Sequence, residues 1–204
     1  MIDDHLEKLS EIFRKFPGIG PRQARRFVFF LLYQSDEYRH KLAEEITDLG
    51  QKINQCSDCR RFFSTDKGNT ICDICANRQA DRHYLMIVEK DADLYNIRQA
   101  HVYNGFYFIL GGLFPLTTTI SDDIKSLEYL IERIKKEDKL QEIIIALSAS
   151  TEGDHTAEII KQKLSQFKNK IKISILGRGL STGTELEYSD PETIKNALKN
   201  KDVF

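Results

Sequence analysis

The sequence lacks three features that would each assign it to a particular class of protein. No apolar run is long enough to span a bilayer, and the acidic, polar N-terminus has no signal-peptide core. The formal net charge of −1 excludes a globally basic coat for nucleic acid, so any phosphate binding must come from a local patch. With 41% hydrophobic and 30% charged residues, the 204-residue sequence is typical of a globular protein. We expect one large domain or two to three small ones, in the cytoplasm.

Cysteine is also scarce, but the four cysteines that are present form two identical pairs. They read Cys56-Ser-Asp-Cys59 and Cys72-Asp-Ile-Cys75, with twelve residues between the pairs. A two-residue gap lets both thiolates of a pair reach one ion, and two pairs complete a tetrahedral sulfur shell. The alternatives are two disulfides or four buried apolar cysteines. We predict one structural zinc ion, whose closed ligand shell folds a loop and leaves no position for a catalytic water.

A local basic patch lies near the start of the chain. From Phe13 to Ser35 there are five basic residues and no acidic ones, whereas acidic residues crowd both sides of this segment. At its centre, residues 16–21 read Phe-Pro-Gly-Ile-Gly-Pro and separate two segments with helical apolar spacing, residues 2–15 and 22–33. Two helices joined by a Gly-Ile-Gly turn indicate a helix-hairpin-helix element.

This hairpin is the candidate nucleic-acid site. Gly18 and Gly20 let a phosphate approach the backbone closely, next to the N–H groups at the start of the second helix. Arg22, Arg25 and Arg26 fall within about a hundred degrees of arc on that helix, opposite its apolar face. We predict that these five residues bind a sugar–phosphate backbone without reading its sequence. The alternative is a solvated helix face that follows an ordinary turn.

Apolar periodicity predicts an alternation of strands and helices after the cysteines. Before them, a third helix is expected over residues 36–54. Beyond them, short apolar runs predict strands over 84–89, 105–110, 142–147 and 172–176, and helical spacing predicts helices over 121–137 and 156–167. A last helix follows Asp190, with Pro191 near its first turn. The pattern indicates an α/β fold with a buried, mostly parallel sheet that helices cover on both faces.

Acidic residues follow two of the expected strands. Glu89 ends the first strand, and Glu152 and Asp154 follow the central one. Two acids at adjacent strand ends could share a magnesium ion, but Glu152 and Asp154 could equally cap the helix that follows. Other candidates for chemistry are weak, since the five histidines show no ligand spacing and no Gly-x-x-x-x-Gly-Lys phosphate loop occurs. Phe62 and Phe63 could stack on bases, but we favour a core role for both.

These features, in this order, resemble the RecR family of bacterial recombination mediators over essentially the whole chain. The resemblance rests on the turn, the cysteines, the run Leu-Gly-Gly-Leu-Phe-Pro-Leu at 110–116 and Leu-Glu-Tyr-Ser-Asp at 186–190. It implies a helix-hairpin-helix DNA-binding region over 1–54, a four-cysteine zinc finger over 55–80 and a Toprim domain over 81–177. It also implies a C-terminal segment over 178–204 that serves oligomerisation and resembles part of an ATPase motif.

The resemblance also implies a function, which is the loading of recombinase onto gapped DNA with the partners RecO and RecF. Such a protein acts in DNA repair and recombination, binds single- and double-stranded DNA, and assembles into a ring-like homo-oligomer, most simply a tetramer. As a weaker implication, Glu142, Glu152 and Asp154 face a partner protein.

The Toprim resemblance raises the question of catalysis. Toprim enzymes carry a metal-binding Asp-x-Asp before their Glu-Gly, and here Ser148 and Ser150 occupy those positions. Serine cannot supply the anionic oxygen ligands that a divalent ion needs for phosphoryl-transfer chemistry. We therefore expect a non-catalytic platform. The alternative is a metal-dependent Toprim nuclease, which would leave the hairpin and the cysteines unexplained.

Overall fold

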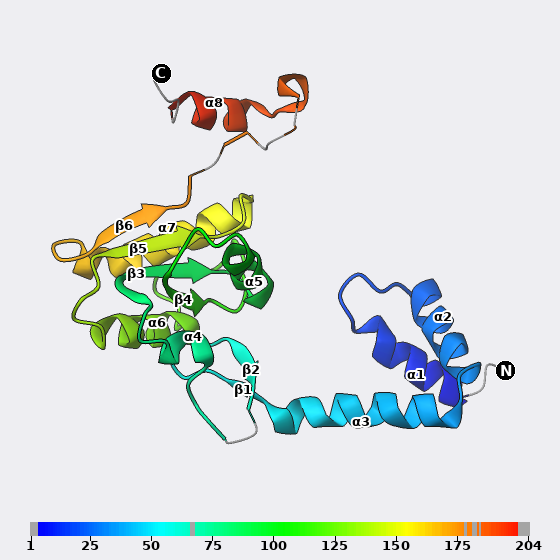
Figure 1. Cartoon of the computed structure of the whole chain (residues 1–204). Helices are drawn as coiled ribbons and strands as arrows, with labels where there is room; N and C mark the ends of the chain where they lie inside the picture. Colours follow the sequence, from blue (N-terminus) through cyan, green and yellow to red (C-terminus); the bar gives the residue numbers. More distant parts are fainter. Residues whose placement is uncertain (1–3, 66–67, 178, 181–182, 184, 200–204) are drawn as a thin grey trace. The chain divides into compact units, whose positions relative to one another are not determined.

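The computed structural model describes residues 4–65, 68–177, 179–180, 183 and 185–199 (Figure 1). The chain divides into two units, Met1–Ile53 and Asn54–Phe204. The finer division predicted at residues 80 and 177 stays a prediction, and parts of the segment 178–204 lie outside the described residues. Among the described helices, none combines the length and the apolar composition needed to cross a bilayer.

The first unit consists of the three helices predicted before the cysteines. They are α1 (Asp4–Arg14), α2 (Pro21–Leu32) and α3 (Asp36–Lys52). Pro21 occupies the first helical position of α2, where its missing N–H removes no helix hydrogen bond. Ser35 caps α3 by accepting a hydrogen bond from the Tyr38 N–H at 3.2 Å. Among residues 4–53 of this unit, only Ser10, Ala24 and Val28 are buried, where α1 and α2 pack together.

A small module holds the four cysteines. It contains β1 (Ile53–Gln55), β2 (Phe62–Ser64) and α4 (Asp73–Ala76), and β1 pairs with β2 in a two-stranded sheet. We call residues 53–76 the four-cysteine module. None of these elements has an apolar pattern long enough to be predicted from sequence, because a core this small consists mainly of the cysteines themselves.

The α/β part contains a four-stranded parallel sheet, as predicted. Its strands are β3 (Asp81–Val88), β4 (Gly105–Ile109), β5 (Glu142–Ala146) and β6 (Lys172–Ile175), in the order β4-β3-β5-β6. The helices are α5 (Asp91–Gln99), α6 (Lys125–Lys135), α7 (Thr151–Leu164) and α8 (Pro191–Lys199). Single 3₁₀ turns occur at Ser165–Phe167 and Leu186–Tyr188. The α/β fold class is confirmed.

Three predicted starts were wrong by three residues or more, those of β3, of α7 and of α6, which begins at Lys125 and not at 121, and outside the four-cysteine module one helix was not predicted. β3 begins at Asp81, and α7 begins at Thr151 because the Ser150 side chain accepts a hydrogen bond from the Gly153 N–H at 3.1 Å. This cap starts α7 five residues before the expected position, and it places Glu152 and Asp154 in the first turn. The missed helix α5 is short and buries only Leu94.

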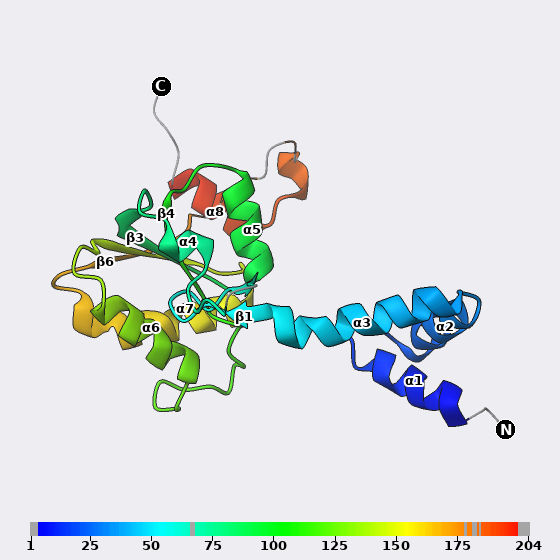
Figure 2. The same ribbon diagram turned by 60° about the horizontal axis from the view of Figure 1, so that its bottom comes forward.

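The two faces of the sheet are covered by different parts of the chain (Figures 1 and 2). On one face, residues from α6 and α7 pack on Leu85, Ile87 and Phe108. On the other face, α5 and the four-cysteine module pack on Met86 and Val88. Helices were expected on both faces, but one face is covered in part by the module.

Candidate metal centre and nucleic-acid interface

The sulfur atoms of the four cysteines form one cluster. These atoms all lie within 4.8 Å of one another, and the sulfurs of Cys59 and Cys72 are 3.6 Å apart. A zinc–sulfur bond length of about 2.3 Å places the sulfurs of a tetrahedral site roughly 3.8 Å apart, so the arrangement fits a metal ion. Within the described part of the chain, this is the one group of three or more Cys, His, Asp or Glu side chains arranged to hold a metal.

Local backbone hydrogen bonds fold each cysteine pair into a tight loop. The Cys56 N–H donates to the Arg61 carbonyl at 2.8 Å, and the Arg60 N–H donates to the Cys56 carbonyl at 2.9 Å. Arg60 closes this loop with a left-handed backbone, at φ 64°. The Cys72 N–H then donates to the Cys56 sulfur at 3.4 Å, which links the second pair to the first.

The thiols affect one another because they lie so close together. A hydrogen bond from Cys59 lowers the pKa of Cys56, whereas a hydrogen bond with Cys56, together with burial, raises the pKa of Cys75. A bound cation favours the thiolate form at all four positions, which is what a closed sulfur shell requires.

The module is also bound to the edge of the large sheet. β4 is an edge strand, and its Ile109 N–H donates to the Cys59 carbonyl at 2.8 Å. The Arg60 guanidinium carbon lies 4.4 Å from the ring centre of Tyr129 on α6. The module thus covers an edge that would otherwise expose unpaired backbone groups.

One core prediction in this module was wrong. Phe63 is buried at 8% exposure, as expected, but Phe62 is 59% exposed. The two residues are neighbours in β2, where successive side chains point to opposite sides of the strand. A single strand can therefore place only one of them in the core.

The hairpin has the geometry of an anion site. Gly18 has a φ of 77°, which favours glycine, and an added Cβ at Gly18 or Gly20 would meet nothing within 4 Å. Gly20 is the N-cap of α2, whose start has neither a side-chain cap nor an acidic residue in the first turn. The backbone N–H groups there are therefore accessible to a ligand.

The three arginines of α2 are exposed but not equivalent. Arg25 lies 3.7 Å from the Glu7 carboxylate on α1, and this ion pair connects the two helices. Arg22 and Arg26 are exposed on the same side of α2. Sequence spacing placed all three on one arc but could not show that an acid from the preceding helix reaches Arg25.

At the strand ends of the Toprim-like sheet, a serine occupies the position next to Glu89. The Ser148 hydroxyl donates to the Glu89 carboxylate at 2.5 Å, and Lys90 lies 3.6 Å from the same carboxylate. Ser150 is engaged as the α7 cap. Glu152 and Asp154 are both exposed. Serines therefore stand at both positions where the catalytic pattern has metal-binding aspartates.

Glu142, the third acid assigned to a partner face, is held by the neighbouring strand. Its carboxylate accepts a hydrogen bond from Ser174 at 2.6 Å and lies 3.2 Å from the Lys172 ammonium. The Ser174 hydrogen bond, and then Lys172, lower the pKa of Glu142. These contacts link the ends of β5 and β6.

Comparison with known proteins gives concordant matches along the chain. A family model described as "RecR, helix-hairpin-helix" matches residues 6–49, and one described as "Toprim domain" matches residues 83–177. A protein of Amoebophilus asiaticus named recombination protein RecR is 34% identical over 204 residues, covering 100% of this chain and 96% of the relative. Proteins of the same name from Bifidobacterium adolescentis (33%, covering 98% and 96%) and Prochlorococcus marinus strain MIT 9515 (34%, covering 96% and 94%) are similar.

Proposed function

Because this chain belongs to the RecR family of recombination proteins, we propose that it is a non-catalytic, DNA-binding mediator of recombination and repair. In this proposal it binds single- and double-stranded DNA and acts with RecO and RecF to load recombinase onto gapped DNA. The observation that carries the proposal is the uncapped, acid-free start of α2 beside exposed arginines.

DNA binding is assigned to the hairpin. Gly18 and Gly20 bring the backbone within reach of a phosphate, and Arg22 and Arg26 add charge-assisted hydrogen bonds beside it. Arg25 contributes less, because Glu7 already offsets part of its charge. All of these contacts go to the sugar–phosphate backbone of DNA, so we expect binding that depends strongly on salt concentration and little on base sequence.

A homo-oligomer, proposed as a ring-like tetramer, is supported by the apolar surface of the first unit. A cavity of about 510 Å³ between α1, α2 and α3 is lined almost entirely by apolar side chains. Large apolar residues also remain about half exposed or more in this unit, among them Phe29, Phe30, Ile46 and Leu49. An uncovered surface of this kind is typical of a subunit interface. Assembly would also multiply a DNA-binding patch that is small on one chain.

The Toprim domain is proposed to act as a platform for partners. The serines at positions 148 and 150 support this, because neither supplies the anionic oxygen that a catalytic ion would need. The exposed acids Glu152 and Asp154, with Glu142, are proposed to face RecO or RecF. Toprim nuclease activity, the alternative, would need anionic ligands at positions 148 and 150.

The metal is proposed to be a single structural zinc ion. Four thiolates in a tetrahedral arrangement select zinc or an iron–sulfur cluster, and the closed shell holds no substrate position. A cytoplasmic location belongs to the same proposal, because clustered thiols that bind a metal are typical of reducing compartments.

The decisive experiment compares two double variants of the full-length protein. Replacing Arg22 and Arg26 with alanine should weaken binding to duplex DNA at least tenfold and reduce the salt slope by about two per protomer. The matched control replaces Lys135 and Lys136, which are exposed on α6 and at its C-cap, and should leave binding within about twofold.

The binding assay should include magnesium and end-labelled DNA, so that cleavage is detected alongside a mobility shift. We expect a shift and intact DNA. Unchanged duplex affinity in the arginine variant would refute the assignment to the hairpin. Magnesium-dependent cleavage that is lost on Glu89→Ala would refute the non-catalytic assignment.

A further inference from the structure

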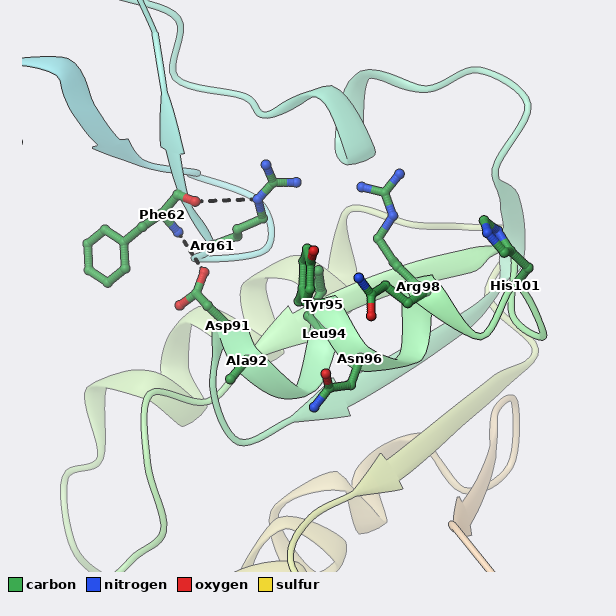
Figure 3. A pocket seen from close by; sticks show the side chains of 10 residues that line it. Arg61, Phe62, Asp91, Ala92, Leu94, Tyr95, Asn96, Arg98 and His101 are labelled. Atoms are coloured by element: carbon green, nitrogen blue, oxygen red, sulfur yellow. Dashed lines mark hydrogen bonds between the residues drawn. The ribbon is translucent and has the colours of Figure 1, made fainter.

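A cavity of about 690 Å³ lies between the four-cysteine module and α5 (Figure 3). The module contributes Arg61 and Phe62, and α5 with the residues after it contributes Tyr95, Arg98 and His101. Figure 3 shows the order along the cavity, in which Phe62 lies at one end, His101 at the other, and Tyr95 between the two arginines. Aromatic rings and cationic groups therefore alternate along it.

The two aromatic side chains are unusually accessible for their size. Phe62 is 59% exposed and Tyr95 is 62% exposed, although each projects from a strand or helix whose opposite side is buried. One exposed aromatic side chain is ordinary, but two in the same hollow offer two ring faces to a ligand.

The two arginines are held in place by a single acid. The Asp73 carboxylate on α4 lies 3.0 Å from the Arg61 guanidinium and 3.6 Å from that of Arg98. Figure 3 shows both guanidinium groups turned to the same side of the cavity. Asp73 and Asp91 together balance the formal charge of the two arginines, so the cavity offers a phosphate the guanidinium N–H groups rather than an excess of positive charge. The acid that lines the cavity itself, Asp91, already accepts a hydrogen bond from the Phe62 N–H at 3.0 Å.

We propose that this cavity binds single-stranded nucleic acid. A base stacks on the Tyr95 ring, and the adjoining phosphate accepts hydrogen bonds from guanidinium N–H groups of Arg61 and Arg98 that Asp73 does not engage. Phe62 provides a second stacking face. Proteins generally bind single strands by stacking successive bases on aromatic rings and by placing cationic groups along the sugar–phosphate backbone. The cavity contains both the aromatic rings and the cationic groups. A duplex is excluded, because its base faces are already stacked on one another. The inference rests on the proposed DNA-binding function and gives it a site distinct from the hairpin.

The absence of tryptophan from the sequence provides a direct test. Tyr95→Trp introduces the only tryptophan, whose emission should be quenched on addition of an oligo(dT) strand to the full-length protein and recovered at high salt. A duplex of the same length should leave the emission unchanged. Tyr129→Trp is the matched control, because Tyr129 is exposed on α6 outside the cavity. Emission at position 95 that does not respond to saturating oligo(dT), or equal quenching at both positions, would overturn the proposal.

Affinity measurements give the second readout. Tyr95→Ala should weaken oligo(dT) binding about five- to a hundredfold, the range for losing one stacked base, while Tyr95→Phe retains the affinity. Duplex affinity should stay within about twofold in both variants. The hairpin variant Arg22→Ala/Arg26→Ala should instead lose duplex binding and keep tryptophan quenching at position 95. The two variants therefore test separately whether the cavity binds single strands and whether the hairpin binds duplex DNA. Two results for Tyr95→Ala would contradict stacking: an equal loss of affinity for single and double strands, or an unchanged affinity for oligo(dT).

Discussion

Removing the metal should unfold more of the protein than the module that binds it. The module shares one apolar cluster with the sheet, because the four cysteines and Phe63 pack with Met86, Val88, Tyr107 and Ile109. Its Cys59 carbonyl also accepts the Ile109 N–H at the sheet edge. Cys72→Ser, or removal of the metal by a strong chelator, therefore exposes one face and one edge of the sheet.

The size of the effect can be worked from the buried side chains. Burial of one Val, Ile or Met side chain contributes about 1.5–3 kcal/mol, so Met86, Val88 and Ile109 together contribute roughly 5–9 kcal/mol. Because α5 still covers part of this face, we expect roughly half of that to be lost, or about 2–5 kcal/mol. Domains are typically stable by about 5–15 kcal/mol, so a loss of this size is a large fraction of the stability of the α/β part.

Hydrogen exchange on the full-length protein, with metal content measured in parallel, tests this reasoning. Amides of β3 and β4 should lose protection in Cys72→Ser and in the chelated protein, together with those of residues 53–76. Ser64→Ala, an exposed position in the same module, is the control and should leave protection unchanged. If the module alone loses protection while β3 and β4 retain theirs, the shared core does not support the sheet and the argument is wrong.

Two further predictions concern single residues, each measured by denaturant unfolding. Gly153→Ala should cost about 3 kcal/mol or more, because the added Cβ would lie 1.9 Å from the Ser148 carbonyl oxygen. The matched Gly50→Ala in α3 should instead stabilise by about 0.5–1 kcal/mol, since nothing lies within 4 Å of its Cβ, and equal effects would contradict the packing. Ser174→Ala should cost about 1 kcal/mol at pH 7, because it removes the main cause of the lowered Glu142 pKa. The stabilisation from a lowered pKa is fully present above the unfolded-state value of about 4.3 and is lost as the pH falls through the lower pKa of the folded state, so wild type and variant should converge under acid. A difference that persists at low pH would implicate packing instead.

The sequence was sufficient for the elements whose apolar periodicity is long. The run over β5 and the helical spacing in α6 each carry enough apolar residues to show their period. The start of α7 was misplaced because the decisive signal is a side-chain cap at Ser150, which comes before any apolar residue of that helix. The helix α5 was missed because its few inward-facing residues give no extended pattern.

For the candidate sites, sequence spacing located the ligands but not their partners. The Cys-x-x-Cys pairs predicted a sulfur cluster, since both residues of each pair are fixed by local geometry. The contacts of Arg25 with Glu7 and of Ser148 with Glu89 join residues that are far apart in the chain. The basic and aromatic cavity also depends on packing of the module against α5, to which no motif in the sequence points.

The four-cysteine module can be both a structural support and a ligand-binding surface, because successive side chains of β2 point to opposite sides of the strand. Phe63 points into the core shared with the sheet, while Phe62 is exposed on the other side of the strand, at one end of the cavity beside α5 (Figure 3). A cysteine variant should therefore lose fold and ligand binding together. Phe62→Ala should lose only affinity for single strands, with the metal retained and the unfolding midpoint unchanged, whereas Phe63→Ala should lower that midpoint sharply. A Phe62→Ala protein with lower stability and normal single-strand affinity would assign that ring to structure instead, and the cavity would then have Tyr95 as its sole stacking face.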